Sequence, residues 1–400
     1  MNTSYIVLTV LFWVFLFILF YAYLGYGIML LILVKVKELF KKKVRIALPE
    51  DDKLPSVTLF ITAFNEEDVV HDKMTNCLNL DYPEDKLDLV WCTDGSDDST
   101  NALLAKYKRV RVLYEPIRNG KTAAMNRGMR YVDTEIVIFT DANTMVNKEA
   151  IRVIVQRFME PKVGCVAGEK RIVNSNTDNA AGGGEGIYWK YESALKAYDD
   201  RLYSAVGAAG ELFAVRRNLF FEMDKDTLLD DFILSLSIAM KGYKIAYTPD
   251  AYAEESGSAD MFEEEKRKVR IAAGGLQSVW RLRPLLNPFK YGVLSFQYVS
   301  HRVLRWTLAP VILFLLFPIN LILAFSPTWS IMYFVFLLCQ VLFYTLGVAG
   351  YIMAKKRIKN KILFVPYYFL FMNWNCIRAI PYLYKKKKQG TGAWEKSKRA

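Results

Sequence analysis

Acidic and amide side chains stand where several apolar runs of the sequence stop, and these residue types can bind ligands or move protons. Asp94, Asp141 and Asn143 follow expected strands, whereas Asp230 and Asp231 begin an expected helix. Carboxylate and amide oxygens suit hard cations such as Mg²⁺ and Mn²⁺, and a carboxylate can accept a proton from a hydroxyl group. Each also has an ordinary structural use, because Asp and Asn cap helices and form turns.

The elements that must position these residues lie between residues 50 and 290, where strand-like and helix-like segments alternate. This alternation predicts an α/β fold with a mostly parallel sheet. Ligands bind beyond the carboxyl ends of such strands, so the polar strand ends should share one site. The expected strands are Val57–Ala63, Leu87–Thr93, Val110–Tyr114 and Glu135–Thr140, and the expected helices are Glu67–Leu80, Asp97–Tyr107, Lys121–Tyr131 and Phe232–Met240.

Missing motifs and the composition argue against several classes of protein. No G-x-G-x-x-G follows the first expected strand and no G-x-x-x-x-G-K-[ST] occurs, which argues against a Rossmann dehydrogenase and a P-loop NTPase. Apolar residues make up 53% of the chain, so it can bury a large core. The five cysteines contain no C-x-x-C pair and are expected to be reduced: Cys77, Cys92, Cys165, Cys339 and Cys376.

The basic charge of the chain gathers at its C-terminal end. Met353–Ala400 carries ten Lys, three Arg and one Glu, and its net charge equals the +12 of the whole chain. A nucleic-acid-binding domain would carry this excess on its folded body. Here it lies beside apolar runs, as in cytosolic loops of membrane proteins, so we expect a lipid bilayer as a partner and no nucleic acid.

The apolar runs predict membrane segments at both ends of the chain. Residues 5–34 contain no charged residue, and basic residues follow from Lys35 to Arg45. We therefore expect residues 1–45 to form an N-terminal transmembrane helix with a basic flank, and residues 46–290 to form a cytosolic domain. An integral protein of the bacterial inner membrane is the expected localisation.

The C-terminal membrane region is expected to cover residues 291–400 and to end in a basic cytosolic tail. Residues 306–325 and 331–354 lack charged residues and are expected to span the bilayer, with an outside turn near 326–330. Residues 362–384 contain Asn373 and Arg378 and have lysine clusters at both ends. We favour a re-entrant or interfacial segment there, with a third span of this region as the alternative.

The ordered set of motifs from about Val57 to Gln277 resembles the membrane-bound family 2 glycosyltransferases, the group that contains cellulose, hyaluronan and poly-N-acetylglucosamine synthases. The resemblance implies a GT-A fold, a nucleotide-diphosphate sugar donor (here expected to be UDP-linked), a divalent metal, Mg²⁺ or Mn²⁺, and inversion at the anomeric carbon. The matching elements are Ala63-Phe-Asn-Glu66, Asp94-Gly-Ser96, Lys121 before Asn126, Asp141-Ala-Asn143, Gly210-Glu-Leu-Phe213 with Arg216-Arg217, and Leu229-Asp-Asp231.

The resemblance also implies roles for these residues. Asp94 matches the carboxylate that binds the nucleoside, and Asp141 matches the first Asp of the D-x-D motif at nucleotide and metal. Asp231 matches the general base, with Asp230 in support. Asn143 stands at the third D-x-D position, where it can ligate the metal through its amide oxygen or simply start a helix. The other residues expected to bind the nucleotide sugar are Ala63, Asn65, Glu66, Lys121 and Asn126.

The chain departs from the Q-x-x-R-W motif of the processive synthases. Arg270 keeps the arginine that can clamp a diphosphate, but Arg267 replaces the glutamine and Ile271 replaces the tryptophan that stacks on the acceptor sugar. Glu211, Arg267 and Ile271 are expected to face the acceptor, although Glu211 and the Arg216-Arg217 pair could instead satisfy one another. The motifs therefore support sugar transfer more strongly than they support synthesis of a long chain.

The expected function is transfer of a sugar to a polysaccharide or lipid-linked acceptor at the cytosolic face of the membrane, with export or assembly proteins as further partners. The alternatives are a non-catalytic nucleotide-sugar-binding regulator and a transporter component of a polysaccharide export system. The apolar spans contain no charged residue for an ion path. The retention of Asp94, Asp141, Asp231 and Arg270 argues against a regulator.

Overall fold

The computed structural model describes residues 3–40, 47–173, 180–257, 261–326, 330–356, 358 and 360–389. Parts of three expected features lie outside these residues. They are residues 41–45 of the basic flank, residues 327–329 of the outside turn and residues 390–400 of the basic tail.

A mixed eight-stranded sheet forms the centre of the described domain, in the order β3-β2-β1-β4-β7-β6-β8-β5. The first four strands of this order are parallel, as expected from their continuous apolar runs, and β6 and β8 are also parallel. β7 runs antiparallel to both β4 and β6, and β5 runs antiparallel to β8. The strands are β1 Val57–Ala63, β2 Leu87–Asp94, β3 Val110–Glu115, β4 Ile136–Asp141, β5 Met145–Val146, β6 Val163–Val173, β7 Leu212–Arg216 and β8 Lys244–Ser256.

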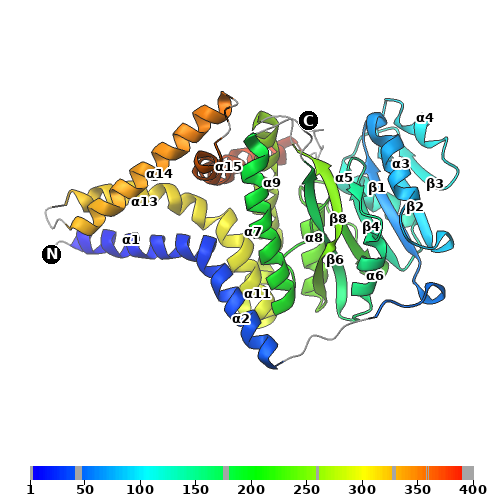
Figure 1. Cartoon of the computed structure of the whole chain (residues 1–400), viewed down its shortest axis with the longest axis horizontal. Helices are drawn as coiled ribbons and strands as arrows, with labels where there is room; N and C mark the ends of the chain where they lie inside the picture. The colour runs from blue at the N-terminus through cyan, green and yellow to red at the C-terminus, as the bar shows by residue number, and fades with distance from the viewer. Residues whose placement is uncertain are drawn as a thin grey trace.

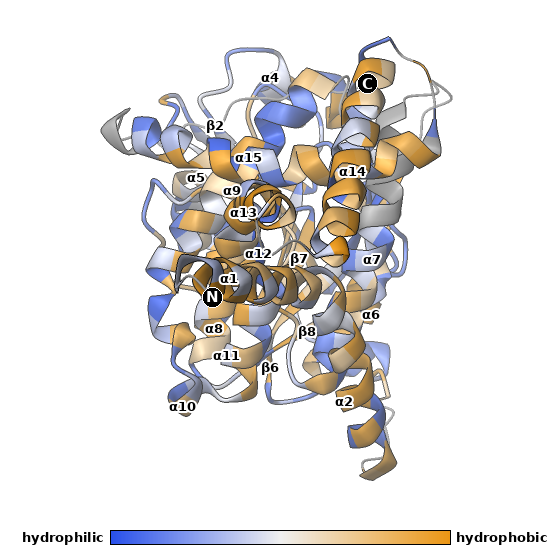
Figure 2. Ribbon diagram, turned by 90° about the vertical axis from the view of Figure 1, so that its left-hand side faces the viewer, coloured by the Kyte–Doolittle hydropathy of each residue, from blue (hydrophilic) through white to orange (hydrophobic). Residues whose placement is uncertain are grey.

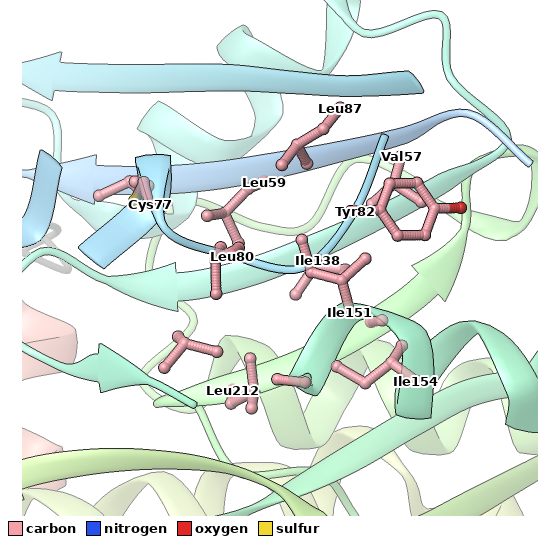
Figure 3. Packing of buried hydrophobic residues seen from close by; sticks show 14 of the residues in the cluster. Val57, Leu59, Cys77, Leu80, Tyr82, Leu87, Ile138, Ile151, Ile154 and Leu212 are labelled. Carbon is pink, nitrogen blue, oxygen red and sulfur yellow. The ribbon is translucent and has the colours of Figure 1, made fainter. Parts of the chain in front are cut away.

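Helices cover both faces of this sheet, so its central strands are buried on two sides. One face packs on α3 and α6, with Leu59, Met74 and Ile154 in the core (Figure 3 shows part of this cluster). The opposite face packs on α5 and α8, with Phe60 and Met125 in its core. The helices of this domain are α3 Val70–Leu78, α4 Thr100–Leu104, α5 Lys121–Gly128, α6 Ala150–Phe158, α7 Ala180–Leu202, α8 Asp230–Met240 and α9 Met261–Arg281.

The remaining helices lie to one side of the sheet, and α7 and α9 lie between most of them and the strands (Figure 1). α1 and α2 form one continuous helical segment with a π-helical turn at Tyr21–Gly25, and the segment bends between them (Figure 1). These helices are α1 Thr3–Phe20, α2 Tyr26–Phe40, α10 Pro288–Tyr291, α11 Val293–Tyr298, α12 Leu304–Trp306, α13 Leu308–Ala324, α14 Ile331–Lys355 and α15 Lys361–Gln389.

Two helices of the described chain are long and apolar enough to cross a membrane, namely Thr3–Phe40 and Ile331–Lys355. The pair Val293–Trp306 and Leu308–Ala324 is bent by 51° and gives a third if it counts as one span. α1, α13 and α14 are hydrophobic along most of their length (Figure 2). α15 is one helix that contains Pro366 and Pro381 and packs against α9 and α14. Its relation to the bilayer stays a prediction.

Candidate active site

The carboxyl ends of β2 and β4 flank that of β1, and this arrangement brings the predicted acidic residues to one edge of the sheet. Asp94 ends β2, and its Oδ2 accepts hydrogen bonds from the backbone N–H groups of Asn119 (2.9 Å) and Gly120 (2.6 Å). Its Oδ1 is buried and accepts no hydrogen bond from the described residues. Burial raises the pKa of Asp94 above its ordinary value, against the two N–H bonds that lower it. A free buried acceptor of this kind suits an N–H group of a nucleobase.

Lys121 connects the C-terminal end of β4 to the N-terminal end of α8. Gly120, which precedes it, has φ of +94°, a conformation that glycine adopts without strain and that lets the chain turn sharply into α5. Lys121 Nζ donates to Asp141 Oδ1 at 2.8 Å and lies 3.8 Å from Asp230 Oδ2. Burial would lower the pKa of Lys121, but Asp141 and Asp230 outweigh it and raise the pKa. The site therefore holds a permanent cation between two carboxylates.

Asp230 and Asp231 form the first turn of α8, as expected. Gly210 lies beside both charged groups, since a Cβ added to it would be 3.7 Å from the Asp231 carboxyl and 3.5 Å from Lys121 Nζ. Burial and the neighbouring Asp230 charge raise the pKa of Asp231 to about 7, although Lys121 lowers it. A carboxylate with such a pKa is suited to accept a proton near neutral pH.

This pKa gives a testable pH dependence. The base must be deprotonated, so turnover is expected to fall as the pH drops below about 7. The Asp230 charge disfavours ionisation of Asp231, so Asp230→Asn should lower the pKa of Asp231 and move this acid limb to lower pH. Rates measured between pH 5 and 9 test this, with Asp224→Asn, whose side chain is 77% exposed, as a control. A limb that stayed in place in Asp230→Asn would contradict the coupling.

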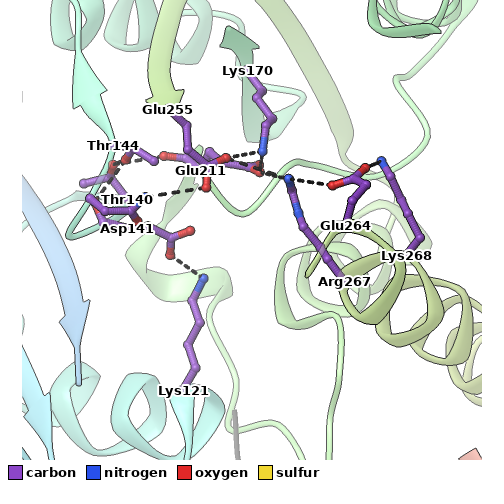
Figure 4. A network of polar contacts seen from close by, with 11 residues as sticks. Lys121, Thr140, Asp141, Thr144, Lys170, Glu211, Glu255, Glu264, Arg267 and Lys268 are labelled. Atoms are coloured by element: carbon purple, nitrogen blue, oxygen red, sulfur yellow. Dashed lines mark hydrogen bonds and ion pairs between the residues drawn. The ribbon is translucent and has the colours of Figure 1, made fainter. Parts of the chain in front are cut away.

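A ladder of buried charges lies beyond Asp141 (Figure 4). Lys170 donates to Glu211 Oε1 at 2.5 Å and also pairs with Glu255. Arg267 lies 3.6 Å from Glu211, 3.8 Å from Glu255 and 3.8 Å from Glu264. Burial would raise the pKa of Glu211, but Lys170 and Arg267 hold it well below its usual range. Glu211 is therefore an ionised, fully paired carboxylate. The alternative that it pairs with Arg216-Arg217 is wrong, because these two arginines donate to backbone carbonyls such as those of Val163 and Val132.

Arg270 and Ile271 of α9 line the same cavity as Asp141 and Asp231. Arg270 makes no hydrogen bond or ion pair with the described residues, and burial lowers its pKa. The guanidinium lies close enough to Asp141 and Asp230 for their charges to counteract that shift. An arginine that faces a cavity beside Lys121 suits the two phosphates of a diphosphate group.

Asp141 and Asn143, the residues expected to bind the metal, offer too few oxygens to hold a divalent cation alone. They fit such a cation only if a bound ligand supplies further oxygens. Asp141 offers a carboxylate at the cavity wall, and Lys121 already holds one of its oxygens. Asn143 Nδ2 donates to Glu255 Oε1 at 3.5 Å, so the structure places this amide beside the charged ladder. Groups of three or more His, Cys, Asp or Glu with metal-site geometry are absent from the described residues. Mg²⁺ is commonly held by one or two carboxylates plus substrate phosphates, which is the pattern that these residues allow.

Restoring the acidic residue at position 143 tests whether Asn143 is a ligand. Asn143→Asp is expected to lower the Mn²⁺ concentration for half-maximal activity several-fold, because an ionised ligand binds a dication more strongly than an amide does. The matched control is Asn79→Asp, since Asn79 is exposed at the end of α3. Equal Mn²⁺ titrations for the two variants and the parent would remove Asn143 from the metal site.

Three of the predicted donor-site residues have backbone or loop partners instead of lining the larger cavity. The Asn126 amide binds the backbone of Met223 through both of its ends. Asn65 pairs with Asp97, and the Glu66 N–H donates to Thr100, so both connect the loop after β1 to the loop after β2. These contacts give the three residues positions that support the loops. Ala63 lies with Asp94 and Arg118 in a small separate cavity.

The larger cavity has a volume of about 570 Å³ and extends from the acidic residues to the candidate membrane helices. Sequence reasoning missed two kinds of lining residue. Glu255 ends β8, where a buried carboxylate after an apolar strand was an available signal. Tyr23, Leu24 and Trp306 reach the cavity from membrane-side elements, and no local pattern indicates this.

Comparisons with known proteins identify the family and the fold. The family model for "Glycosyltransferase like family 2" matches residues 55–274. A poly-beta-1,6-N-acetyl-D-glucosamine synthase of Staphylococcus aureus is 27% identical over 238 residues, which are 58% of this chain and 57% of that relative. The chain thus spans a little over half the length of this relative. The synthase of Staphylococcus epidermidis is 24% identical over 368 residues, 86% of this chain and 88% of the relative.

A solved structure shows the fold. A mannosyltransferase of Pyrobaculum calidifontis, solved with GDP-Man and Mn²⁺, superimposes on this chain with a TM-score of 0.70 at 22% identity. The match covers 95% of this chain and 99% of the other, which shows the GT-A fold.

Proposed function

The chain belongs to the glycosyltransferase-like family 2, and on this premise we propose that it moves a sugar from a UDP-linked donor to a polysaccharide or lipid-linked acceptor, with inversion. One observation carries the proposal. A single cavity holds an arginine without a charge partner among the described residues, a permanently charged lysine and a carboxylate whose pKa is about 7. These are the groups that a departing diphosphate and an attacking hydroxyl require.

The proposed role of each group follows from its position in the cavity. Asp94 binds the nucleobase through its free buried oxygen, and Lys121 and Arg270 hold the diphosphate. Asp231 takes the proton of the acceptor hydroxyl while the hydroxyl oxygen attacks the anomeric carbon, on the side opposite the departing diphosphate. Asp141 and Asn143 would hold a divalent cation, which supplies charge neutralisation of the diphosphate when bound. Glu211 and Arg267 position the wall around the acceptor.

A donor panel tests this proposal. The full-length protein in detergent with Mn²⁺ would receive labelled UDP-N-acetylglucosamine, UDP-glucose, UDP-galactose and GDP-mannose, and the released nucleoside diphosphate and the product size would be measured. One UDP-sugar should be turned over far faster than the others, and Asp231→Asn should abolish that turnover. Absence of diphosphate release from every donor by monodisperse protein would contradict the proposal.

The proposal also requires the domain of residues 46–290 to face the cytosol, where nucleotide sugars are made. Single cysteines can be introduced at Thr328, in the expected outside turn, and at Glu84, whose side chain is 81% exposed. We expect these two cysteines to differ in how they are labelled in intact cells. An impermeant thiol reagent should label the first and not the second, and both after lysis. Three native cysteines are buried and contribute little background: Cys77, Cys92 and Cys165. Labelling at Glu84 from outside would show that the domain of residues 46–290 lies on the opposite side of the membrane from the one proposed.

A further inference from the structure

A buried lysine of α7 lines the larger cavity. Lys196 of α7 is 4% exposed and lines the cavity, and its ammonium makes no hydrogen bond or ion pair with the described residues. Its Nζ lies 5.8 Å from the ring centre of Trp189 and 5.9 Å from that of Tyr247. Burial lowers the pKa of Lys196, although carboxylates farther away oppose this. The fold therefore carries this charge at a net cost, which suits a group kept for a ligand.

The aromatic side chain of Trp306 lines the same cavity. Glu192 stands one turn before Lys196 on α7 and accepts a hydrogen bond from Arg302 at 2.9 Å. The Arg302 guanidinium lies 5.7 Å from the ring centre of Trp306, which lines the cavity and is partly exposed. Trp306 also meets Phe232 edge-on at 5.0 Å, and Phe232 directly follows Asp231. Trp306 thus lies near the proposed base.

The position of Trp306 depends on a glycine of α9. An added Cβ on Gly275 would lie 2.5 Å from the indole, so only a residue without a side chain lets the ring pack there. Gly275 stands one turn after Ile271, and residues four apart share a helix face. The indole from α12 therefore lies along the same face of α9 as the position where the family motif has its tryptophan.

We propose that Lys196 and Trp306 form a binding subsite for a sugar ring of a glycan acceptor. This inference rests on the proposed function. The ammonium would donate to ring hydroxyls, and the electron-rich indole would contact the C–H bonds of the ring. We assign a neutral polyhydroxy ring rather than a lipid phosphate to this wall, because Glu192 already holds Arg302 and Arg305 and the face of an indole offers a phosphate no hydrogen bond.

The test measures transfer from the donor that the panel identifies to a β-1,6-linked N-acetylglucosamine tetramer, by full-length protein in detergent. Lys196→Met and Trp306→Ala should each raise the KM for the tetramer about tenfold, and Trp306→Phe should restore part of the loss. The KM for the donor and the slow transfer to water should stay within about twofold. Trp280→Ala is the control, since Trp280 is 71% exposed on α9 and lies outside the cavity lining.

A stability measurement separates binding from folding in these variants. Lys196→Met removes a disfavoured buried charge, so its thermal unfolding midpoint should be unchanged or higher while the KM for the tetramer rises. An unchanged KM in both variants would overturn the subsite, and so would a parallel loss of donor hydrolysis. Transfer to polyprenyl phosphate that depends on these residues, without transfer to the tetramer, would assign the wall to a lipid instead. Absence of donor hydrolysis by the parent protein would refute the proposed function itself.

Discussion

Replacing Asp231 by asparagine is expected to lower the turnover number about 10²–10⁴-fold, because the amide has the shape of the carboxyl group but cannot accept a proton. Binding of the nucleoside diphosphate should stay within about twofold, since Lys121, Arg270 and Asp94 are unchanged. Turnover by the full-length protein and titration with UDP measure the two effects. Asp224→Asn, on an exposed side chain, is the matched control.

Stability distinguishes this loss of activity from damage to the fold. The pKa of Asp231 is raised by folding, so the folded state holds the proton more tightly than the unfolded chain does. Ionisation of Asp231 therefore costs stability as the pH rises from about 4 to about 7. Asp231→Asn removes this cost, and its unfolding midpoint at pH 8 should equal or exceed that of the parent. A variant that kept more than about a tenth of the turnover would exclude Asp231 as the base.

Lys170→Met is expected to lower the free energy of unfolding by about 3–5 kcal/mol, which is typical for breaking a buried ion pair. The Lys170 side chain is 1% exposed, and the change would leave Glu211 and Glu255 with Arg267 as their nearest cation, at 3.6 and 3.8 Å. Urea unfolding of the full-length protein in detergent, followed by tryptophan fluorescence, measures the loss.

Two further variants sharpen this test. Lys244→Met breaks a partly exposed pair with Glu160, whose side chains are 27% and 35% exposed, and should change the stability by less than about 1 kcal/mol. Glu255→Gln added to Lys170→Met removes one of the two carboxylates that lose Lys170 and should restore part of the stability. Equal losses in Lys170→Met and Lys244→Met would mean that the buried ladder is not a special source of stability.

The parallel half of the fold could be predicted because buried strands read as continuous apolar runs. β1 has the predicted bounds, and β2, β3 and β4 differ by a residue at their ends. α4 is shorter than the predicted helix at 97–107, and a 3₁₀ turn occupies the start of the predicted helix at 67–80. The antiparallel insertion of β7 between β4 and β6 was not predicted, since strand order depends on contacts that no local pattern encodes.

The acidic residues could be located at strand and helix ends, but their long-range partners could not. Glu255 and Lys170 are 85 positions apart and meet only because β6 and β8 pair. The cavity wall joins still more distant segments, as shown by Arg305, whose Nε donates to the carbonyl of Ala22 at 2.9 Å across 283 positions. Asn126 illustrates the opposite case, because a polar side chain in a matching motif can serve the backbone of its own fold.

The candidate membrane helix at Thr3–Phe40 also forms part of the cavity. Tyr23 and Leu24 line the cavity, and the Tyr23 hydroxyl donates to Asn373 of α15 at 2.5 Å. A fragment cut at residues 46 and 290 would keep Asp94, Lys121 and the other donor-side groups. It would lose the parts of the cavity wall that come from Tyr23 and Leu24, from Trp306 and from α15. We expect such a fragment to act as a slow nucleotide-sugar hydrolase, so screens for inhibitors of sugar transfer need the intact chain.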